Sequence, residues 1–162
     1  MPLYEYEFFH GAALIRILSG ISNGLHVTRR AEFGNGAYIL DGRIGVFLKY
    51  SSKRMSPWIF TFTSEHKATL QQLSAECESV AVEMICNDDG IVSMDCQSIL
   101  ALLQPENKAQ WSVSVTRRRR QMYTVSGTGG IHSAKLADGK YLGDLLSSER
   151  RLDHAHDALD NN

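Results

Sequence analysis

The sequence has few cysteines and no pairing pattern among them. Its three cysteines, Cys77, Cys86 and Cys96, are odd in number and contain no C-x-x-C spacing, which argues against a disulfide framework or a zinc ribbon. We therefore expect a reducing compartment. A chain of 162 residues buries roughly two-thirds of its unfolded surface on folding. Its fold needs neither disulfides nor a structural metal.

Long apolar runs are also missing. No window reaches the ~18 uninterrupted apolar residues of a membrane span, and residues 1–5 have no basic flank ahead of an apolar stretch. These absences predict a cytoplasmic protein with no membrane partner. The net charge is only −1, from 17 basic and 18 acidic side chains, so overall charge neither demands nor forbids a polyanionic partner.

A nucleotide-binding P-loop is absent as well. The segment Gly127-Thr128-Gly129-Gly130 is rich in glycine, but the pattern G-x-x-x-x-G-K-[S/T] does not occur. We expect these glycines to form a hairpin connection.

Apolar periodicity and turn residues predict an α+β, mixed α/β domain built on a central mixed sheet. Helical spacing predicts an N-terminal helix and two further short helices, over residues 4–18, 64–76 and 97–103. Strand patterns occur at residues 25–30, 37–40, 44–50, 58–62, 80–86, 91–94, 111–116 and 122–125. We expect one globular domain over residues 1–146 and a polar, flexible tail over residues 147–162.

The most distinctive local feature is a hairpin that runs from Tyr38 to Ser52. Asp41-Gly42 is a tight-turn dipeptide between its strands, and Lys49 lies on the outgoing strand. Metal-dependent phosphodiester hydrolysis needs carboxylates that hold Mg²⁺ or Mn²⁺, and commonly a lysine near the charged transition state. Asp41 and Lys49 are therefore candidate catalytic residues.

This arrangement resembles the PD-(D/E)xK nuclease superfamily, in which a helix carrying an acid precedes a strand–acid–strand unit that ends in a lysine. The resemblance covers roughly residues 4 to 86 as an order of elements. It implies a restriction-endonuclease-like fold with Mg or Mn as cofactor. It also implies that Asp41 is the first metal ligand, Lys49 the lysine, and Glu7 or Glu5 an auxiliary catalytic acid on the opening helix.

The chain departs from the family pattern at two positions. Phe47 stands two residues before the lysine, where the family has an acid, and Leu40 replaces the proline before Asp41. A second carboxylate would have to come from Glu83 or Glu32, since one acid alone binds such a metal poorly. We therefore favour a turn role for Asp41 and a solvated strand end for Lys49.

Basic residues form the second candidate site. Lys53 and Arg54 follow Lys49 in the next loop, and a run of four arginines lies at a predicted hairpin tip. The run comprises Arg117, Arg118, Arg119 and Arg120. Such cations bind phosphates without reading sequence, which makes DNA or RNA a candidate partner. The alternative is a solvated turn that protects an edge strand from aggregation.

The sequence therefore supports three hypotheses about function. The first is a small nucleic-acid-associated accessory domain on a degenerate nuclease-like scaffold. The second is a protein-interaction or regulatory module whose arginines face an acidic partner. The third is an active Mg-dependent nuclease. His10 has no nucleophile among its helical neighbours, so we expect it to have a structural role.

Overall fold

The computed structural model describes residues 1–148. The predicted tail over residues 147–162 lies outside the described residues, except for its first two positions, which are helical. None of the helices within residues 1–148 combines the length and the apolar character needed to cross a membrane.

The predicted helices and strands are all present, with bounds that differ by no more than two residues. In chain order the elements are α1 (Glu5–Ser19), β1 (Val27–Arg29), the 3-10 helix η1 (Ala31–Phe33), β2 (Ala37–Leu40), β3 (Ile44–Ser51), β4 (Trp58–Thr63), α2 (Ser64–Glu76), β5 (Ser79–Cys86), β6 (Ile91–Asp95), α3 (Cys96–Leu102), β7 (Gln110–Thr116), β8 (Thr124–Gly127) and β9 (Gly130–Ile131). Residues 140–148 form a further helix, called here the 140–148 helix.

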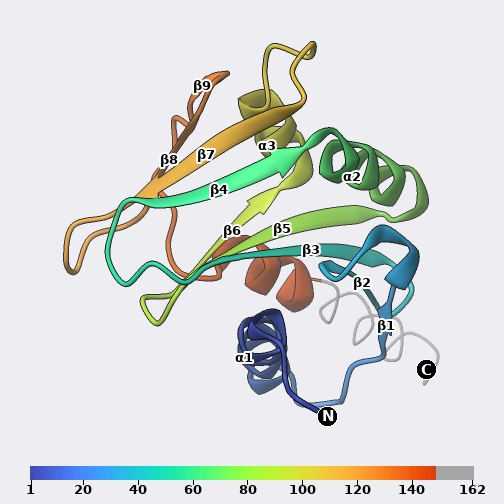
Figure 1. Ribbon diagram of the computed structural model, residues 1–162. Coiled ribbons are helices and arrows are strands. Elements are labelled where there is room, and N and C mark those ends of the chain that lie inside the picture. Colours follow the sequence, from blue (N-terminus) through green and yellow to red (C-terminus); the bar gives the residue numbers. More distant parts are fainter. Residues whose placement is uncertain (149–162) are drawn as a thin grey trace, which may run out of the picture.

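The strands form two sheets (Figure 1). The mixed sheet has the order β1-β2-β3-β5-β6, in which β3 and β5 are parallel and the other neighbours are antiparallel. The second sheet is antiparallel, with the order β4-β7-β8-β9. The α+β class and the mixed sheet are thus confirmed. The sequence did not reveal the second sheet, because alternation shows which face of a strand is buried but not which strand pairs with it.

A separate hydrophobic core covers each face of the mixed sheet. The core between the two sheets also receives α2 and α3, and it contains Phe47, Val82 and Met84 opposite Phe60 and Phe62. The core on the other face is covered by α1 and the 140–148 helix, as Figure 1 shows. Its residues include Ala13, Val46, Leu48, Ala81 and Leu142. Successive residues of β3 and β5 alternate between the cores, as the period of two requires.

The glycine-rich segment Gly127–Gly130 packs closely against α3. A Cβ atom at Gly129 would lie 2.1 Å from the Ala101 carbonyl oxygen. A Cβ atom at Gly127 would lie 2.9 Å from the Leu102 carbonyl oxygen. These glycines therefore permit a close approach of two backbones, in keeping with the predicted hairpin connection.

Candidate nucleic-acid interface

Asp41 lies in the tight turn between β2 and β3. Its φ is 49° and that of Gly42 is 69°, both in the left-handed region that such a turn requires. The Asp41 Oδ1 atom accepts a hydrogen bond of 2.8 Å from the backbone N–H of His26. The Asp41 N–H donates in turn to the His26 carbonyl at 2.8 Å. The carboxylate therefore fastens the turn to the segment before β1.

Lys49 lies toward the other end of β3. The β2–β3 register pairs Leu40 with Ile44 beside the turn, and Lys49 is five residues farther along the strand. At about 3.3 Å per residue, those five residues place it roughly 16 Å from the turn. The structure therefore does not bring Asp41 and Lys49 together. Asp41 lies in the turn of the hairpin, and Lys49 lies near the opposite end of β3.

The other candidate acids are engaged elsewhere. Glu7 Oε2 accepts a hydrogen bond of 2.6 Å from the Tyr4 N–H, so this carboxylate caps the start of α1. Glu5 accepts a bond of 3.3 Å from the Tyr50 hydroxyl. Glu83 pairs with Leu48 in the β3–β5 register, on the face of the sheet opposite to Lys49. None of these three carboxylates lies beside the Lys49 amine.

Glu32 lines the same groove as Lys49, but an arginine holds it. Arg30 forms ion pairs with both Glu32 and Glu76. Within residues 1–148, no group of three His, Cys, Asp or Glu side chains is arranged to hold a metal ion. The residues around Lys49 therefore do not fit Mg²⁺ or Mn²⁺, which need several oxygen ligands.

Lys49 opens into a groove of about 740 Å³ between α1, β3, η1 and the start of α2, called here the lysine groove. Its Nζ atom lies 3.4 Å from Nδ1 of His66 and 5.1 Å from the centroid of the Phe62 ring. Burial lowers the pKa of Lys49 to about 8, because the charged amine has lost much of its water. Burial, followed by the nearby Lys49 charge, also lowers the pKa of His66.

The sequence analysis does not predict His66 as a residue of this site. A helix-capping pattern at the start of α2 nevertheless determines its position. Thr63 is the N-cap of α2, one residue before the predicted Ser64. The Thr63 hydroxyl accepts a hydrogen bond from the His66 N–H, and His66 Nδ1 accepts one of 3.1 Å from the Thr63 N–H. This reciprocal pair is a capping box with histidine in the third helical position. It directs the imidazole toward Lys49.

His10 is buried, as expected for a structural histidine. Its Nδ1 atom lies 3.2 Å from the Tyr38 hydroxyl, and burial lowers its pKa. It lines the lysine groove from the side of α1.

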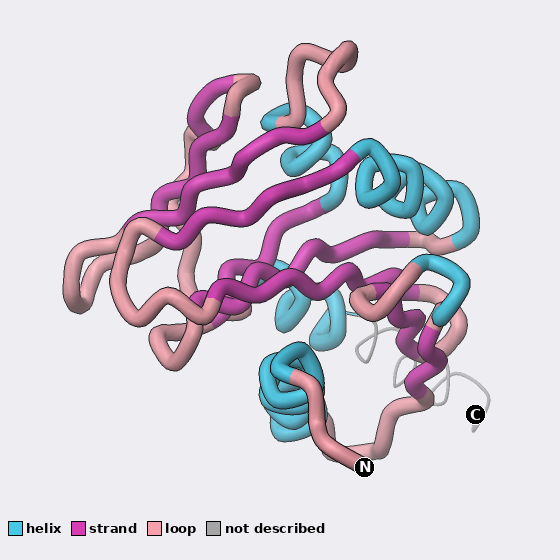
Figure 2. The backbone as a smooth tube through the Cα atoms, viewed as in Figure 1, coloured by secondary structure: helices cyan, strands magenta, loops and turns pink. Residues whose placement is uncertain are grey.

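The basic loops meet at one end of the molecule. The β3–β4 and β7–β8 loops project together beside the paired strands β4 and β7 (Figures 1 and 2). The Arg117 N–H donates a hydrogen bond of 3.2 Å to the Ser56 hydroxyl and joins the two loops directly. We call their five exposed cations the basic end. They are Lys53, Arg54, Arg118, Arg119 and Arg120.

Arg117 differs from the other arginines because it anchors the loop. It is half-buried, with its Nε atom 2.8 Å from Asp89 Oδ2 and its guanidinium carbon 4.4 Å from the centroid of the Tyr123 ring. Its Nη2 atom also donates to the Asp89 carbonyl at 3.2 Å. Arg117 therefore positions the tip rather than offering its charge to a ligand.

Trp58, the first residue of β4, is buried. Its indole N–H donates a hydrogen bond of 2.8 Å to the Lys53 carbonyl, which holds the β3–β4 loop against the core. The ring packs 6.2 Å from Tyr123, centroid to centroid. Trp58 thus supports the basic end from below and presents no face to a base.

Comparisons with known proteins give one partial likeness. No protein-family model matches the chain, and neither does any curated protein. Among solved structures it is similar to Hjc, a Holliday junction resolvase from the archaeal hyperthermophile Archaeoglobus fulgidus, with 11% sequence identity and a TM-score of 0.43. The likeness covers 65% of this chain and 80% of that one.

Proposed function

We propose that this chain is an accessory domain that binds nucleic acid through phosphate contacts at the basic end, without hydrolysing it. The observation that carries the proposal is the convergence of two basic loops, distant in sequence, on one anchored surface. Arg117, Ser56 and Trp58 hold the loops in place, and the remaining cations face solvent.

The charge of the basic end is available to a partner. None of its five cations forms an ion pair with any residue in the described part of the chain. Among the described residues, Lys53 donates only to the Pro57 carbonyl, at 2.9 Å. A protein with a net charge of −1 thus concentrates unpaired positive charge at one end, which supports local attraction of a polyanion.

The same geometry favours binding that does not depend on base sequence. Arginine and lysine side chains on loop tips contact phosphates, whereas sequence reading needs side chains held against base edges. Because Trp58 is buried, stacking adds little at this surface. We therefore expect log K to fall linearly with log salt concentration, with a slope of about −0.9 per neutralised phosphate on duplex DNA and about −0.7 on single strands.

Fluorescence anisotropy at several salt concentrations tests the proposal with duplex DNA, single-stranded DNA and RNA. The test variant carries Arg118→Gln and Arg119→Gln. Arg120 is kept because its φ of 64° makes its position sensitive to substitution. The control variant carries Lys108→Gln and Lys140→Gln, which remove the same charge from exposed positions outside the basic end.

Only the first variant should weaken binding and reduce the salt slope, by about 1 per lost phosphate contact. Equal weakening in both variants would show that net charge, not this surface, governs binding. A wild-type protein that binds none of the three nucleic acids at low salt would overturn the proposal. Binding of polyglutamate under those conditions would instead support the acidic-partner hypothesis.

A further inference from the structure

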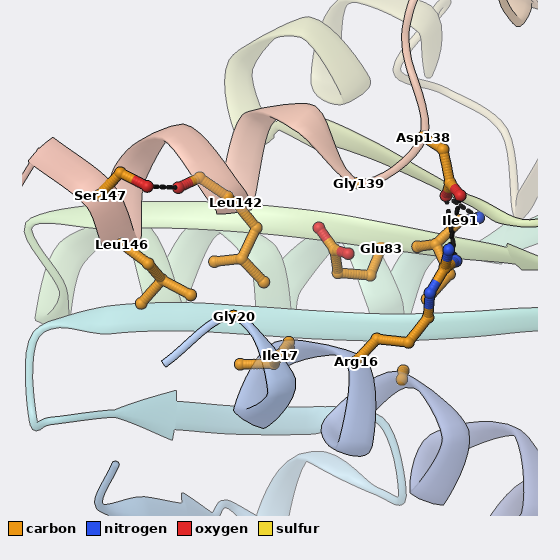
Figure 3. Close-up of a pocket in the computed structure, with 12 residues that line it drawn as sticks. Arg16, Ile17, Gly20, Glu83, Ile91, Asp138, Gly139, Leu142, Leu146 and Ser147 are labelled. Carbon is orange, nitrogen blue, oxygen red and sulfur yellow. Dashed lines mark hydrogen bonds and ion pairs between the residues drawn. The ribbon is translucent and has the colours of Figure 1, made fainter. Parts of the chain in front are cut away.

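A second cavity lies on the face of the mixed sheet that α1 covers, whereas the Lys49 side chain lies on the other face. It has a volume of about 280 Å³, is partly open to solvent and is lined by α1, the 140–148 helix and the strands beneath them. Figure 3 shows the side chains of Ile17, Leu142 and Leu146 projecting into the space between the two helices, with Glu83 beside them. The walls are thus mainly apolar, and the floor carries a carboxyl group.

Glu83 is buried at that floor, with 3% of its surface exposed. Its Oε1 atom accepts a hydrogen bond from the Ser93 hydroxyl, and Ser93 Oγ in turn accepts one of 2.9 Å from the Leu142 N–H. Within residues 1–148, Glu83 Oε2 accepts no hydrogen bond. Half of this carboxyl group therefore faces the cavity without a partner.

Arg16, a cation that lines the cavity, does not form an ion pair with Glu83. Arg16, at the rim, gives both terminal nitrogens to Asp138, at 3.1 Å and 2.6 Å. Asp138 Oδ1 also accepts a bond of 2.7 Å from the Ile91 N–H, which fixes the pair in place. Arg16 and Asp138 thus cancel each other's charge at the rim, and within residues 1–148 Glu83 forms no ion pair of its own.

A buried carboxyl without a counter-ion costs stability, and an apolar residue would avoid that cost. Ala81 and Ile85, two positions away on the same face of β5, are apolar. Glu83 therefore breaks the apolar pattern on this face of β5 at the position that contributes to the floor of this cavity. This combination indicates a ligand with a positive charge.

We propose that this cavity binds a small organic ammonium ion, with its charged head on Glu83 and its apolar part against Ile17, Leu142 and Leu146. An anion is disfavoured, because Glu83 and Asp138 both face the space. A neutral apolar molecule would leave Glu83 Oε2 without a partner. The volume lies near the lower end of the range for ligand pockets, about 300 Å³ and above, which limits the ligand to a small one.

Binding should depend on pH in a defined direction. Burial is the main cause that raises the pKa of Glu83 to about 7; the Ser93 hydroxyl lowers it, Asp138 raises it and Arg16 lowers it. An alkylammonium ion keeps its proton to about pH 10. The ion pair therefore requires Glu83 to lose its proton, so affinity rises as the pH increases through 7.

Isothermal titration calorimetry on the full chain tests the proposal with hexylammonium and phenethylammonium, compared with 1-hexanol and hexanoate. Glu83→Gln removes the charge and keeps the shape. Asp144→Asn is the matched control, since Asp144 lies on the 140–148 helix outside the cavity lining. We expect the ammonium ions to bind wild type and the Asp144 variant alike. Binding should be about tenfold weaker at pH 6 than at pH 8, and at least as much weaker in the Glu83 variant.

Equal affinity for hexanol and hexylammonium would show that the cavity binds apolar groups without using the charge of Glu83, and would overturn the proposal. Unchanged affinity for the ammonium ions in the Glu83 variant would also overturn it. Absence of binding by folded wild-type protein would overturn it too. Ala13→Leu, which extends a wall residue and keeps Glu83, should also block the probes. The pH comparison on wild type remains decisive if neither variant folds. None of these outcomes depends on nucleic-acid binding.

Discussion

Lys49 and Glu83 lie one register position apart on the adjacent parallel strands β3 and β5, yet their side chains occupy opposite faces of the sheet. Lys49 pairs with Met84 and faces the second sheet, whereas Glu83 pairs with Leu48 and faces α1. Each group has lost much of its water, and neither forms an ion pair with any of the described residues. The pKa of the amine is therefore lowered and that of the carboxyl is raised.

Replacing Lys49 with methionine should stabilise the protein at pH 7. The pKa of Lys49 is lowered from 10.5 to about 8, so the folded state binds fewer protons than the unfolded state between these values. Stability therefore rises with pH across that window, and below pH 8 the buried charge is a cost. We expect Lys49→Met to raise the free energy of unfolding at pH 7 by about 1–3 kcal/mol.

Urea unfolding of wild type and Lys49→Met at pH 7 and pH 10.5 measures this effect, and the difference between the two proteins should shrink at the higher pH. Lys53→Met, at an exposed position, is the control and should change the free energy of unfolding little. Destabilisation by Lys49→Met at pH 7 would contradict the expected desolvation cost.

Glu83 should make stability fall as pH rises from 4.5 to 7. Its pKa is raised from 4.5 to about 7, so the folded state binds more protons than the unfolded state in this window. The stabilising contribution is complete below pH 4.5 and is lost by the time the carboxyl ionises in the folded protein. The loss is on the order of 3 kcal/mol for wild type.

Denaturant unfolding between pH 4.5 and 8 checks this prediction. Glu83→Gln, which does not titrate, should flatten the profile in that window, whereas Asp144→Asn should leave it unchanged. A profile with the same slope in Glu83→Gln as in wild type would assign the pH dependence to other groups.

Lys49 should be the most reactive lysine near neutral pH. With a pKa of about 8, about half of its amine is unprotonated at pH 8, compared with under ~1% for a lysine of ordinary pKa. The lysine groove gives small reagents access to it. Trace labelling with acetic anhydride at pH 8, followed by mass spectrometry, should modify Lys49 before Lys53. Labelling of Lys53 first would show that the groove restricts access more than the lowered pKa promotes reaction.

Local patterns predicted the elements well because they depend on neighbouring residues. The strand predicted at residues 58–62 is present, and its alternating residues Trp58, Phe60 and Phe62 are buried on one face. This pattern does not show which strands pair with one another, so the second sheet could not be predicted from it. Long-range partners are set by how whole faces pack, which a short pattern does not report.

The candidate sites show the same division. The sequence predicts the arginine run at a hairpin tip, and the structure places it between the paired strands β7 and β8. The sequence does not separate Arg117, which is an anchor, from the other three arginines. Only its tertiary partners, Asp89 and Tyr123, distinguish it from its neighbours. Of the residues discussed for the lysine groove, the sequence predicts a site role for Lys49 but not for His66. His66 lies on α2, which follows a strand of the other sheet, so its proximity to Lys49 depends on how the two sheets pack.

Asp41 could act as a catalytic metal ligand or as a residue that stabilises its turn. Substitutions at Asp41 distinguish these two roles. The Asp41 carboxylate accepts the His26 N–H, and its backbone adopts a left-handed conformation. Asp41→Ala loses the hydrogen bond and suits that conformation poorly, so we expect it to lower the free energy of unfolding by about 1–2 kcal/mol. Asp41→Asn keeps an acceptor oxygen and tolerates the same φ, so it should cost less.

Nuclease assays with Mg²⁺ and Mn²⁺ complete the comparison. Wild type, Asp41→Asn and Lys49→Ala should give the same residual degradation, since Asp41 and Lys49 lie far apart and no carboxylate within residues 1–148 forms an ion pair with the amine. Asparagine is the informative replacement here, because it removes the charge that a metal needs while it preserves the turn. Degradation by wild type that both folded variants abolish would restore the catalytic interpretation and overturn the non-hydrolytic role.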